Sequence, residues 1–180
     1  MRKVILALGT SLDLHIARPN GAVDFLYMPK DLYPVQAAFF RRIDTAILGR
    51  KTYEDALAMG GNFSEWKLTY YLMTRSPLAN PVPEVTVTSA TPAQVVSRIR
   101  RKPGKHIWLM GGGELARSFL AADLVDELSF AVVPKLLGAG RPLFPQGFPE
   151  REFSLLRNES YGKGVIALTY ARKRPRKKSR

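Results

Sequence analysis

The apolar positions of this chain predict strands that alternate with helices over its first two-thirds. Val4–Thr10 is an almost continuous apolar run, which is typical of a strand buried on both faces. Residues 32–42 have apolar positions at helical spacing, and Pro34 falls in the first turn, where its missing N–H costs nothing. Thr91-Pro-Ala-Gln94 has the pattern of a capping box at a helix start. The same criteria predict strands at residues 45–48, 68–74, 85–88 and 107–110, and helices at residues 51–59, 91–101 and 114–122.

The pattern changes after residue 122. Three strands, predicted at residues 127–133, 153–156 and 165–170, follow one another through glycine-rich connections with no helical pattern between them. Strands in direct succession favour antiparallel pairing, whereas strands separated by helices favour parallel pairing. The sequence therefore predicts one α/β domain whose central sheet is mostly parallel, with antiparallel C-terminal strands.

Composition agrees with a soluble globular domain. Apolar residues make up 46% of the chain and charged residues 24%. No run approaches the roughly 18 apolar residues of a membrane span, and the apolar N-terminus continues without a cleavage site, so we predict a strand there rather than a signal peptide. The absence of cysteine excludes disulfides and thiolate metal sites. We expect a cytoplasmic protein that has no metal site and no membrane segment.

The net charge of +13 is unevenly distributed. Residues 172–180 carry seven positive charges and no acid. Such a segment is typical of a disordered, solvated tail, and it is also suited to non-specific binding of a polyanion. We therefore predict a folded domain at residues 1–171 and a basic tail at residues 172–180.

Three turns fall at the carboxyl ends of predicted strands, where ligands bind in open α/β sheets. Glycine allows a ligand to approach the backbone closely, and the N–H groups at a helix start attract anions. Each turn alone is equally consistent with an ordinary connection, but the three together favour a ligand with more than one phosphate. The candidate binding residues are Gly49, Arg50, Lys51 and Thr52; Thr74, Arg75 and Ser76; and Gly111, Gly112, Gly113, Glu114 and Leu115.

The third turn also matches a loose dinucleotide-binding pattern, Gly111-x-Gly113-x-x-Ala116. A Rossmann site needs an acidic residue some 20 positions further on, at the end of the next strand. Residues 131–136 contain no carboxylate, and the glycines follow four earlier strands instead of opening the unit. The Rossmann interpretation is therefore disfavoured.

As an ordered set, the motifs resemble the dihydrofolate reductase-like family, and within it the reductase domain of bacterial riboflavin biosynthesis. The resemblance covers roughly residues 2–171, and any single piece of it is weak. Its pieces are Ser11-Leu-Asp13 with Ile16-Ala17, Ile43-Asp-Thr-Ala-Ile-Leu-Gly-Arg-Lys-Thr-Tyr-Glu54, Met73-Thr-Arg-Ser76, Ile107-Trp-Leu-Met-Gly-Gly-Gly-Glu-Leu115, Leu124-Val-Asp-Glu-Leu128, Pro134 and Gly138-Ala-Gly-Arg-Pro-Leu-Phe144.

This resemblance implies a three-layer αβα sandwich, NADPH as the hydride donor and a homodimer. By analogy, residues 49–52 line the diphosphate and adenosine side, and residues 111–115 hold the diphosphate. Thr74, Arg75 and Ser76 would meet the ribose 2′-phosphate, which is consistent with a preference for NADPH over NADH. Ala7, Ile16 and Ala17 would lie beside the nicotinamide.

The sequence departs from the family pattern in two places. Leu14 stands where relatives usually have glycine. Tyr33 falls near the position at which a true dihydrofolate reductase has a carboxylate, with Asp31 two residues earlier. Asp13 and Asp31 are therefore the catalytic candidates, with a local turn role as the alternative for Asp13 and a loop or capping role for Asp31. Strict folate reduction is accordingly less favoured than reduction of a related heterocycle.

Two functional hypotheses follow. The first is an NADPH-dependent reductase of a small pyrimidine-, pterin- or ribityl-type substrate. The alternative is a nucleotide- or nucleic-acid-binding protein that kept the fold without the reductase activity. The alternative draws on the basic tail and on the cations Arg98, Arg100, Arg101, Lys102 and Lys105.

Overall fold

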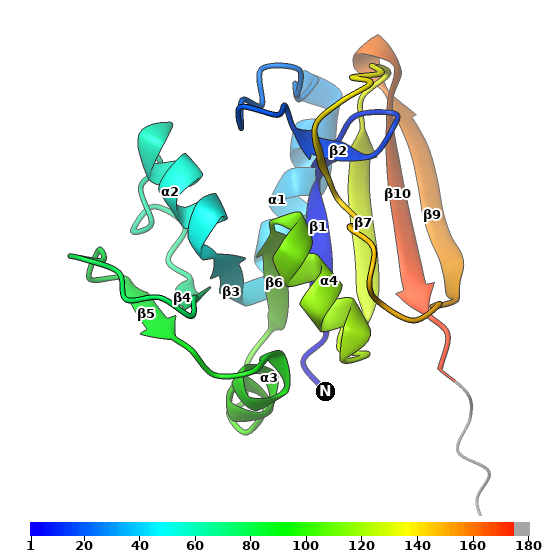
Figure 1. The fold of residues 1–180 in the computed structure, drawn as a ribbon. Coiled ribbons are helices and arrows are strands. Elements are labelled where there is room, and N and C mark those ends of the chain that lie inside the picture. The colour runs from blue at the N-terminus through cyan, green and yellow to red at the C-terminus, as the bar shows by residue number, and fades with distance from the viewer. Residues whose placement is uncertain (175–180) are drawn as a thin grey trace, which may run out of the picture.

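An eight-stranded sheet forms the centre of the computed structural model, which describes residues 1–174 (Figure 1). The strand order is β5-β4-β3-β6-β1-β7-β10-β9. The strands from β5 to β7 in this order are parallel, whereas β10 is antiparallel to both β7 and β9. The bounds are β1 Val4–Thr10, β3 Ile43–Gly49, β4 Thr69–Met73, β5 Val85–Thr88, β6 His106–Gly111, β7 Glu127–Val132, β9 Phe153–Tyr161 and β10 Val165–Arg172.

Four helices cover the two faces of the sheet. Neighbouring positions of β3 point to opposite faces, and they divide between two cores. Ile47 packs in the cluster that contains side chains of α3 and α4, whereas Ala46 and Leu48 pack with Tyr53 of α2. Phe39 of α1 contacts Trp108, which belongs to the α2 side. The helices are α1 Tyr33–Arg42, α2 Arg50–Ala58, α3 Pro92–Arg100 and α4 Gly113–Ala121, with 3-10 turns η1 at Lys30–Leu32 and η2 at Gly162–Gly164.

This arrangement is the predicted three-layer αβα sandwich, with a mostly parallel sheet and antiparallel C-terminal strands. α1 and α2 lie on one side of the sheet, and α3 and α4 on the other. The predicted capping box of α3 is present, because the Thr91 and Gln94 side chains bond reciprocally to each other's backbone N–H groups. The fold prediction is therefore confirmed.

Two parts of the fold were missed by the hydrophobic pattern. β9 continues to Tyr161, well beyond residue 156, because its polar second half is held by pairing with β10 at the edge of the sheet. A small second sheet joins β2, His15–Ala17, to β8, Arg141–Pro142. Neither β2 nor the second half of β9 has the apolar alternation that would mark it as a strand, so only the pairing in the folded chain defines it.

No helix within residues 1–174 has the length and apolar character needed to cross a membrane.

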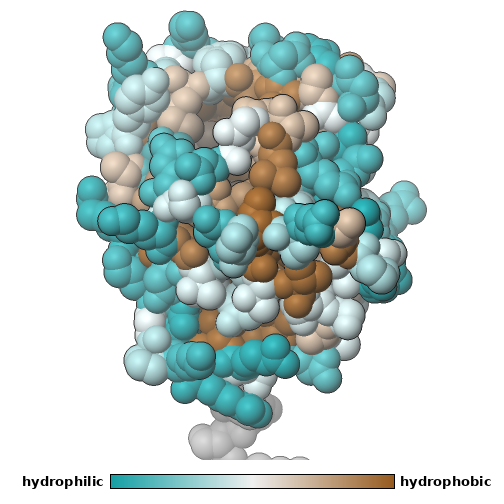
Figure 2. All heavy atoms as spheres, turned by 90° about the vertical axis from the view of Figure 1, so that its left-hand side faces the viewer, coloured by the Kyte–Doolittle hydropathy of each residue, from teal (hydrophilic) through white to brown (hydrophobic). Residues whose placement is uncertain are grey.

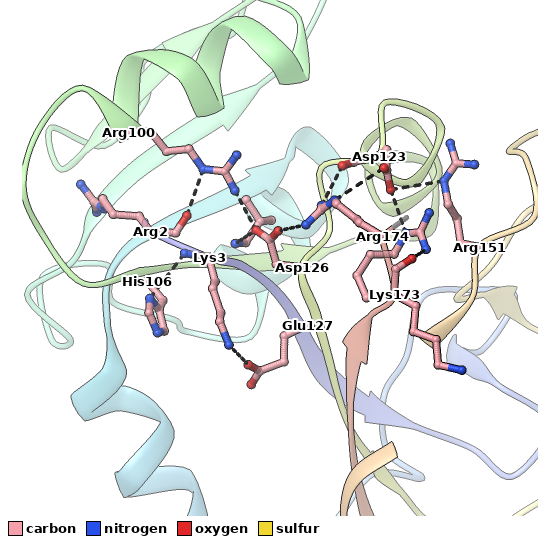
Figure 3. Close-up of polar contacts among 12 residues, drawn as sticks. Arg2, Lys3, Arg100, His106, Asp123, Asp126, Glu127, Arg151, Lys173 and Arg174 are labelled. Atoms are coloured by element: carbon pink, nitrogen blue, oxygen red, sulfur yellow. Dashed lines mark hydrogen bonds and ion pairs between the residues drawn. The ribbon is translucent and has the colours of Figure 1, made fainter. Parts of the chain in front are cut away.

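A buried carboxylate joins the N-terminal edge of the sheet to α3 and to the C-terminal end of the described chain (Figure 3). Asp126 Oδ2 accepts hydrogen bonds from Val4 N at 2.8 Å and Arg100 Nη2 at 2.7 Å. Its other oxygen accepts one from Arg174 Nη1 at 2.6 Å. Arg172, the last residue of β10, bonds to Asp123 at 2.8 Å. Residues 172–174 of the predicted tail therefore contact the domain, and the remainder of that tail lies outside the described residues.

We predict that Asp126→Ala lowers the free energy of unfolding by about 3 kcal/mol. The substitution leaves a buried N–H and an arginine without their acceptor, which costs far more than the loss of an exposed pair. Urea denaturation measures the effect. The control is Glu152→Ala, which removes an exposed partner of Lys173 and should change stability by less than about 0.5 kcal/mol. Equal losses of unfolding free energy in the two variants would contradict the conclusion that Asp126 joins these elements.

Candidate functional site

The three predicted ligand turns lie side by side at one edge of the sheet. Gly49, the last residue of β3, pairs with Met73 at the end of β4. On its other side, β3 pairs with β6 through Leu48 and Gly111. Because these strands are parallel and their last residues pair with one another, the turns that follow them begin next to one another. Sequence segments more than 60 residues apart thus meet at the carboxyl edge, as the motifs predicted.

The glycine stretch brings the start of α4 close to its neighbours. Gly111 has φ +103°, a conformation that favours glycine, and the Gly111–Gly112 peptide bond is cis. At Gly113 a Cβ would overlap the carbonyl oxygen of Pro142, so only glycine allows α4 to begin against β8. At Gly112 a Cβ would lie 3.6 Å from Thr52 Oγ1 and 3.8 Å from Ile16 Cδ1. The start of α4, the first turn of α2 and β2 therefore surround a single small gap.

Two helices begin at this edge without a side-chain cap. The N-cap residues are Gly49 for α2 and Gly112 for α4, and no side chain of the described residues caps either helix. By contrast, α3, which follows β5, has a complete capping box. The first N–H groups of a helix lack intrahelical acceptors and carry a partial positive charge. Both uncapped ends are therefore suited to hold an anionic group.

The turn after β4 presents a free arginine. Thr74 Oγ1 accepts a hydrogen bond from Ser76 N at 3.3 Å and donates one to Ser76 O at 3.1 Å, which fixes the turn. Arg75 is exposed and has no hydrogen-bond or ion-pair partner within residues 1–174. Arg50 bonds to Glu54 at 2.7 Å and to Pro77 O at 3.2 Å, so it joins α2 to this turn. Lys51 is exposed next to it.

The residues predicted to lie beside the nicotinamide come from β1 and β2. Ala7 is 8% exposed, and its carbonyl accepts a hydrogen bond from Trp108 Nε1 at 2.8 Å. Ile16 reaches towards the gap at Gly112, and Ala17 is buried behind it. Leu14 occupies the left-handed region with φ +56°, so it keeps a backbone conformation that glycine adopts more easily.

Asp13 holds two loops together. Its carboxylate accepts hydrogen bonds from Ser11 Oγ at 2.6 Å, from Gly138 N at 2.8 Å and from Leu137 N at 3.1 Å. The Ser11 hydroxyl, together with those backbone N–H groups, holds the pKa of the Asp13 carboxyl well below its ordinary value of 3.8. His15 Nδ1 lies 3.3 Å away, but within residues 1–174 it has no hydrogen-bond partner of acceptable geometry. These contacts match the local turn role, and a catalytic role for Asp13 stays a prediction.

Asp31 lies in η1 and contacts the turn between β9 and β10. Its Oδ2 accepts a hydrogen bond from Gly162 N at 2.8 Å. This contact matches the loop role considered for Asp31, and its catalytic role also stays a prediction. Among residues 1–174, no group of three or more His, Asp or Glu side chains is arranged to hold a metal ion.

An ion pair that the sequence did not suggest connects α2 to β8 near this edge. Arg141 Nη1 donates to Asp55 Oδ2 at 2.8 Å, and both side chains are partly exposed. The pair joins residues 86 positions apart, so no local pattern marks it. The sequence held one signal for this pair, because Arg141 lies within Gly138–Phe144, a stretch that carries the family resemblance.

The fold and the glycine-lined edge define a dihydrofolate reductase-like α/β domain. The family model of the RibD C-terminal domain matches residues 64–167. Two uncharacterised proteins of Bacillus subtilis (strain 168) are similar over nearly the whole chain. YwjB is 32% identical over 169 residues, covering 91% of this chain and 95% of that protein, and YyaP is 28% identical, covering 94% of each. The chain therefore belongs to the RibD C-terminal domain family.

Solved structures share the fold at lower identity. A protein of Shewanella sp. PV-4, named provisionally for riboflavin biosynthesis, has a TM-score of 0.85 and 24% identity, over 96% of this chain and 99% of that one. A diaminohydroxyphosphoribosylaminopyrimidine deaminase/5-amino-6-(5-phosphoribosylamino)uracil reductase of Thermotoga maritima has a TM-score of 0.72 and 14% identity, over 96% of this chain and 57% of that one. A pyrimidine reductase-like protein of Corynebacterium diphtheriae has a TM-score of 0.66 and 17% identity, over 97% and 93%.

We predict that Asp13→Asn destabilises the protein at neutral pH and that the difference narrows in acid. The folded pKa of Asp13 lies below its unfolded value, so the ionised group stabilises the fold above pH 3.8. That contribution is lost as the pH falls below 3.8 towards the folded pKa. Urea midpoints of both proteins at neutral pH and near pH 3 measure the change. A gap between wild type and variant that stays constant with pH would contradict the assigned contacts.

Proposed function

We propose that the protein is an NADPH-dependent reductase that transfers a hydride to a small pyrimidine-, pterin- or ribityl-type substrate. Its membership of the RibD C-terminal domain family supports reductase chemistry. The structural relative from T. maritima is named as a 5-amino-6-(5-phosphoribosylamino)uracil reductase, and the one from C. diphtheriae as pyrimidine reductase-like. These names support a pyrimidine ring in the substrate. The proposal includes the homodimer implied by the family resemblance.

The geometry around Gly112 is the observation that carries this proposal. Two uncapped helix N-termini converge there with a backbone that bears no side chain. A diphosphate is a compact dianion that needs several N–H donors, and this arrangement supplies them from two directions. Thr52 adds a hydroxyl, for which the described residues provide no hydrogen-bond partner. The residues therefore fit the diphosphate of a dinucleotide.

The remaining predicted residues fit the two ends of the same ligand. Arg75 is free to pair with a phosphate on the adenosine side, where Thr74 and Ser76 form the surrounding turn. Ala7 and Ile16 lie on the opposite side of the gap, on β1 and β2, and present apolar surface for a nicotinamide ring. In this assignment the ligand crosses the carboxyl edge from β4 to β1.

Aromatic side chains lie on the α1 and α2 side of the sheet, next to the strand that carries Ala7. Trp108 contacts the rings of Phe39, Phe40 and Trp66, with centroids 5.6 to 5.7 Å away. Figure 2 views the molecule from the side of α2 and β5, and apolar side chains run down the middle of this face between hydrophilic ones. Trp66 is 44% exposed. We propose that the substrate ring binds on this side, where apolar surface limits access of water.

In the proposed reaction, hydride transfer needs little acid–base catalysis from the protein. When bound, NADPH supplies the hydride. The contribution of the chain is to hold the two rings together and to exclude water from them. Since the Asp13 carboxylate is engaged by Ser11, Leu137 and Gly138, we propose that the balancing proton comes from water.

We predict that Gly112→Ala weakens NADPH binding by about tenfold or more, a loss of about 1.4 kcal/mol, without unfolding the protein. The added methyl group has ordinary contacts of 3.6 and 3.8 Å in the free chain, but it occupies the gap assigned to the diphosphate. The quenching of protein fluorescence by NADPH measures affinity.

The control is Gly162→Ala, whose methyl group would meet Asp31 and Pro29 at 3.4 Å, in the turn between β9 and β10, several strands away from Gly112. The affinity of the Gly162→Ala variant for NADPH should equal that of wild type. If the wild-type chain does not bind NADPH at all, the proposed function is wrong.

We predict that Arg75→Ala weakens binding of NADPH by about 2 kcal/mol and leaves NADH unaffected. A charge-assisted hydrogen bond to a phosphate contributes about 1.5–3 kcal/mol, and only NADPH carries the 2′-phosphate. Titration of both cofactors measures the difference. Arg41→Ala, at an exposed arginine of α1 without a partner in the described chain, should leave both affinities unchanged. Equal weakening of NADPH and NADH by Arg75→Ala would refute the 2′-phosphate assignment.

A further inference from the structure

A basic surface lies on α3 and the turn that follows it, outside the reductase site. Residues 85–113 contain five cations and no acid. Arg98, Arg101, Lys102 and Lys105 are exposed, and within residues 1–174 no side chain or backbone group accepts a hydrogen bond from their side chains. Unlike most other cations of the domain, these four therefore keep their full charge available for a ligand.

Two of these cations, Arg98 and Arg101, line shallow, open grooves along α3. One groove is bounded by Arg98, Arg101 and Gln94 together with small residues, and a second by Arg100, Arg101 and Leu124. Gln94, Arg98 and Arg101 follow helical spacing, so they share one side of the helix. Ala90, Ala93 and Ser97 leave room beside them for a ligand to approach. Guanidinium forks next to amide and hydroxyl donors are suited to phosphate oxygens.

The described C-terminal end of the chain lies beside this surface. Asp126 accepts hydrogen bonds from Arg100 of α3 and from Arg174, so the two arginines are neighbours (Figure 3). The nearby carboxylates are already paired, Asp123 with Arg151 and Arg172. In the sequence, four more cations and no acid follow Arg174. Asp44 accepts a hydrogen bond from Lys105 N but is paired with Arg2, so within residues 1–174 no acid forms an ion pair with the four free cations.

We propose that α3 and residues 101–105 bind the phosphate backbone of double-stranded nucleic acid without reading its base sequence. Several free cations close together, at the end of α3 and in the turn that follows it, favour a polyanion over a single phosphate, because each phosphate contact releases counterions. Neither groove is lined by an aromatic residue. Binding of single strands depends on bases that stack on aromatic side chains, so the surface favours a duplex.

This activity is independent of the proposed reductase function. The α3–β6 turn leads into the N-terminal end of β6, whereas Gly111 lies at its other end. The C-terminal end of α3 and residues 101–105 therefore lie at the opposite end of the sheet from Gly112. Failure of NADPH binding leaves this proposal unaffected, and failure of nucleic-acid binding leaves the reductase proposal unaffected.

The test is fluorescence anisotropy of a short labelled DNA duplex, titrated with the full chain at several salt concentrations. Affinity should fall steeply with salt. In the triple variant Arg98→Gln/Arg101→Gln/Lys102→Gln, the slope of log affinity against log salt should become shallower by about 2.7, because each lost phosphate contact removes about 0.9. These side chains are exposed and unpaired, so the variant should keep the wild-type unfolding midpoint.

The matched control removes three exposed lysines from the other end of the sheet, as Lys30→Gln/Lys135→Gln/Lys163→Gln. It carries the same net charge as the α3 variant and should keep the wild-type slope. In a chain truncated after Arg174, the α3 substitutions should make the slope of log affinity against log salt shallower by the same amount. Equal effects of the two triple variants, or loss of all binding on truncation alone, would overturn the proposal.

Two further ligands decide the class of partner. The single-stranded form of the same oligonucleotide should bind more weakly than the duplex. Vesicles of phosphatidylserine and phosphatidylcholine should bind more weakly than the duplex at the same salt concentration. Tighter binding of the single strand would overturn the duplex assignment. Binding to vesicles without binding to the duplex would assign the surface to membranes.

Discussion

The candidate site at Gly112 depends on how closely the backbone at Gly113 approaches the Pro142 carbonyl. No residue with a Cβ fits between them, so this contact sets the start of α4 directly against β8. β8 pairs with β2, and β2 carries Ile16 into the gap at Gly112. Gly113, which has no side chain, thus determines where β2, β8, the start of α4 and the Ile16 side chain meet.

The two ends of the sheet have different physical characters. At the carboxyl ends of the strands, backbone donors are left without side-chain acceptors, which suits a bound anion but does little to stabilise the free protein. At the amino ends, the buried carboxylates of Asp126 and Glu127 are paired with cations from several elements (Figure 3). Buried charges are tolerated when they are paired and hydrogen-bonded, so this end joins the elements together. Arg98, Arg101, Lys102 and Lys105 remain exposed and form no ion pair with those acids.

Much of the fold was predictable because it depends on neighbours in the sequence. The parallel strands have long apolar runs, and the α3 helix begins with a capping box whose two partners are three residues apart. The same holds for the three ligand turns, each of which follows its strand directly. β9 was predicted too short because an edge strand exposes most of its side chains, so pairing with β10 rather than apolar pattern defines its length.

The sequence by itself determined the class of fold, the order of its elements and the residues able to present backbone donors to an anion, because periodicity, turn chemistry and glycine act over a few neighbouring positions. Only the tertiary structure decided which groups each charged side chain contacts. It joins Asp13 to Leu137 and Gly138, Asp31 to Gly162, and Asp55 to Arg141, across 86 to 131 residues. Such pairs have no local signature, since they exist only once strand register and helix packing have brought distant segments together. The same packing leaves Arg98, Arg101, Lys102 and Lys105 without partners within residues 1–174.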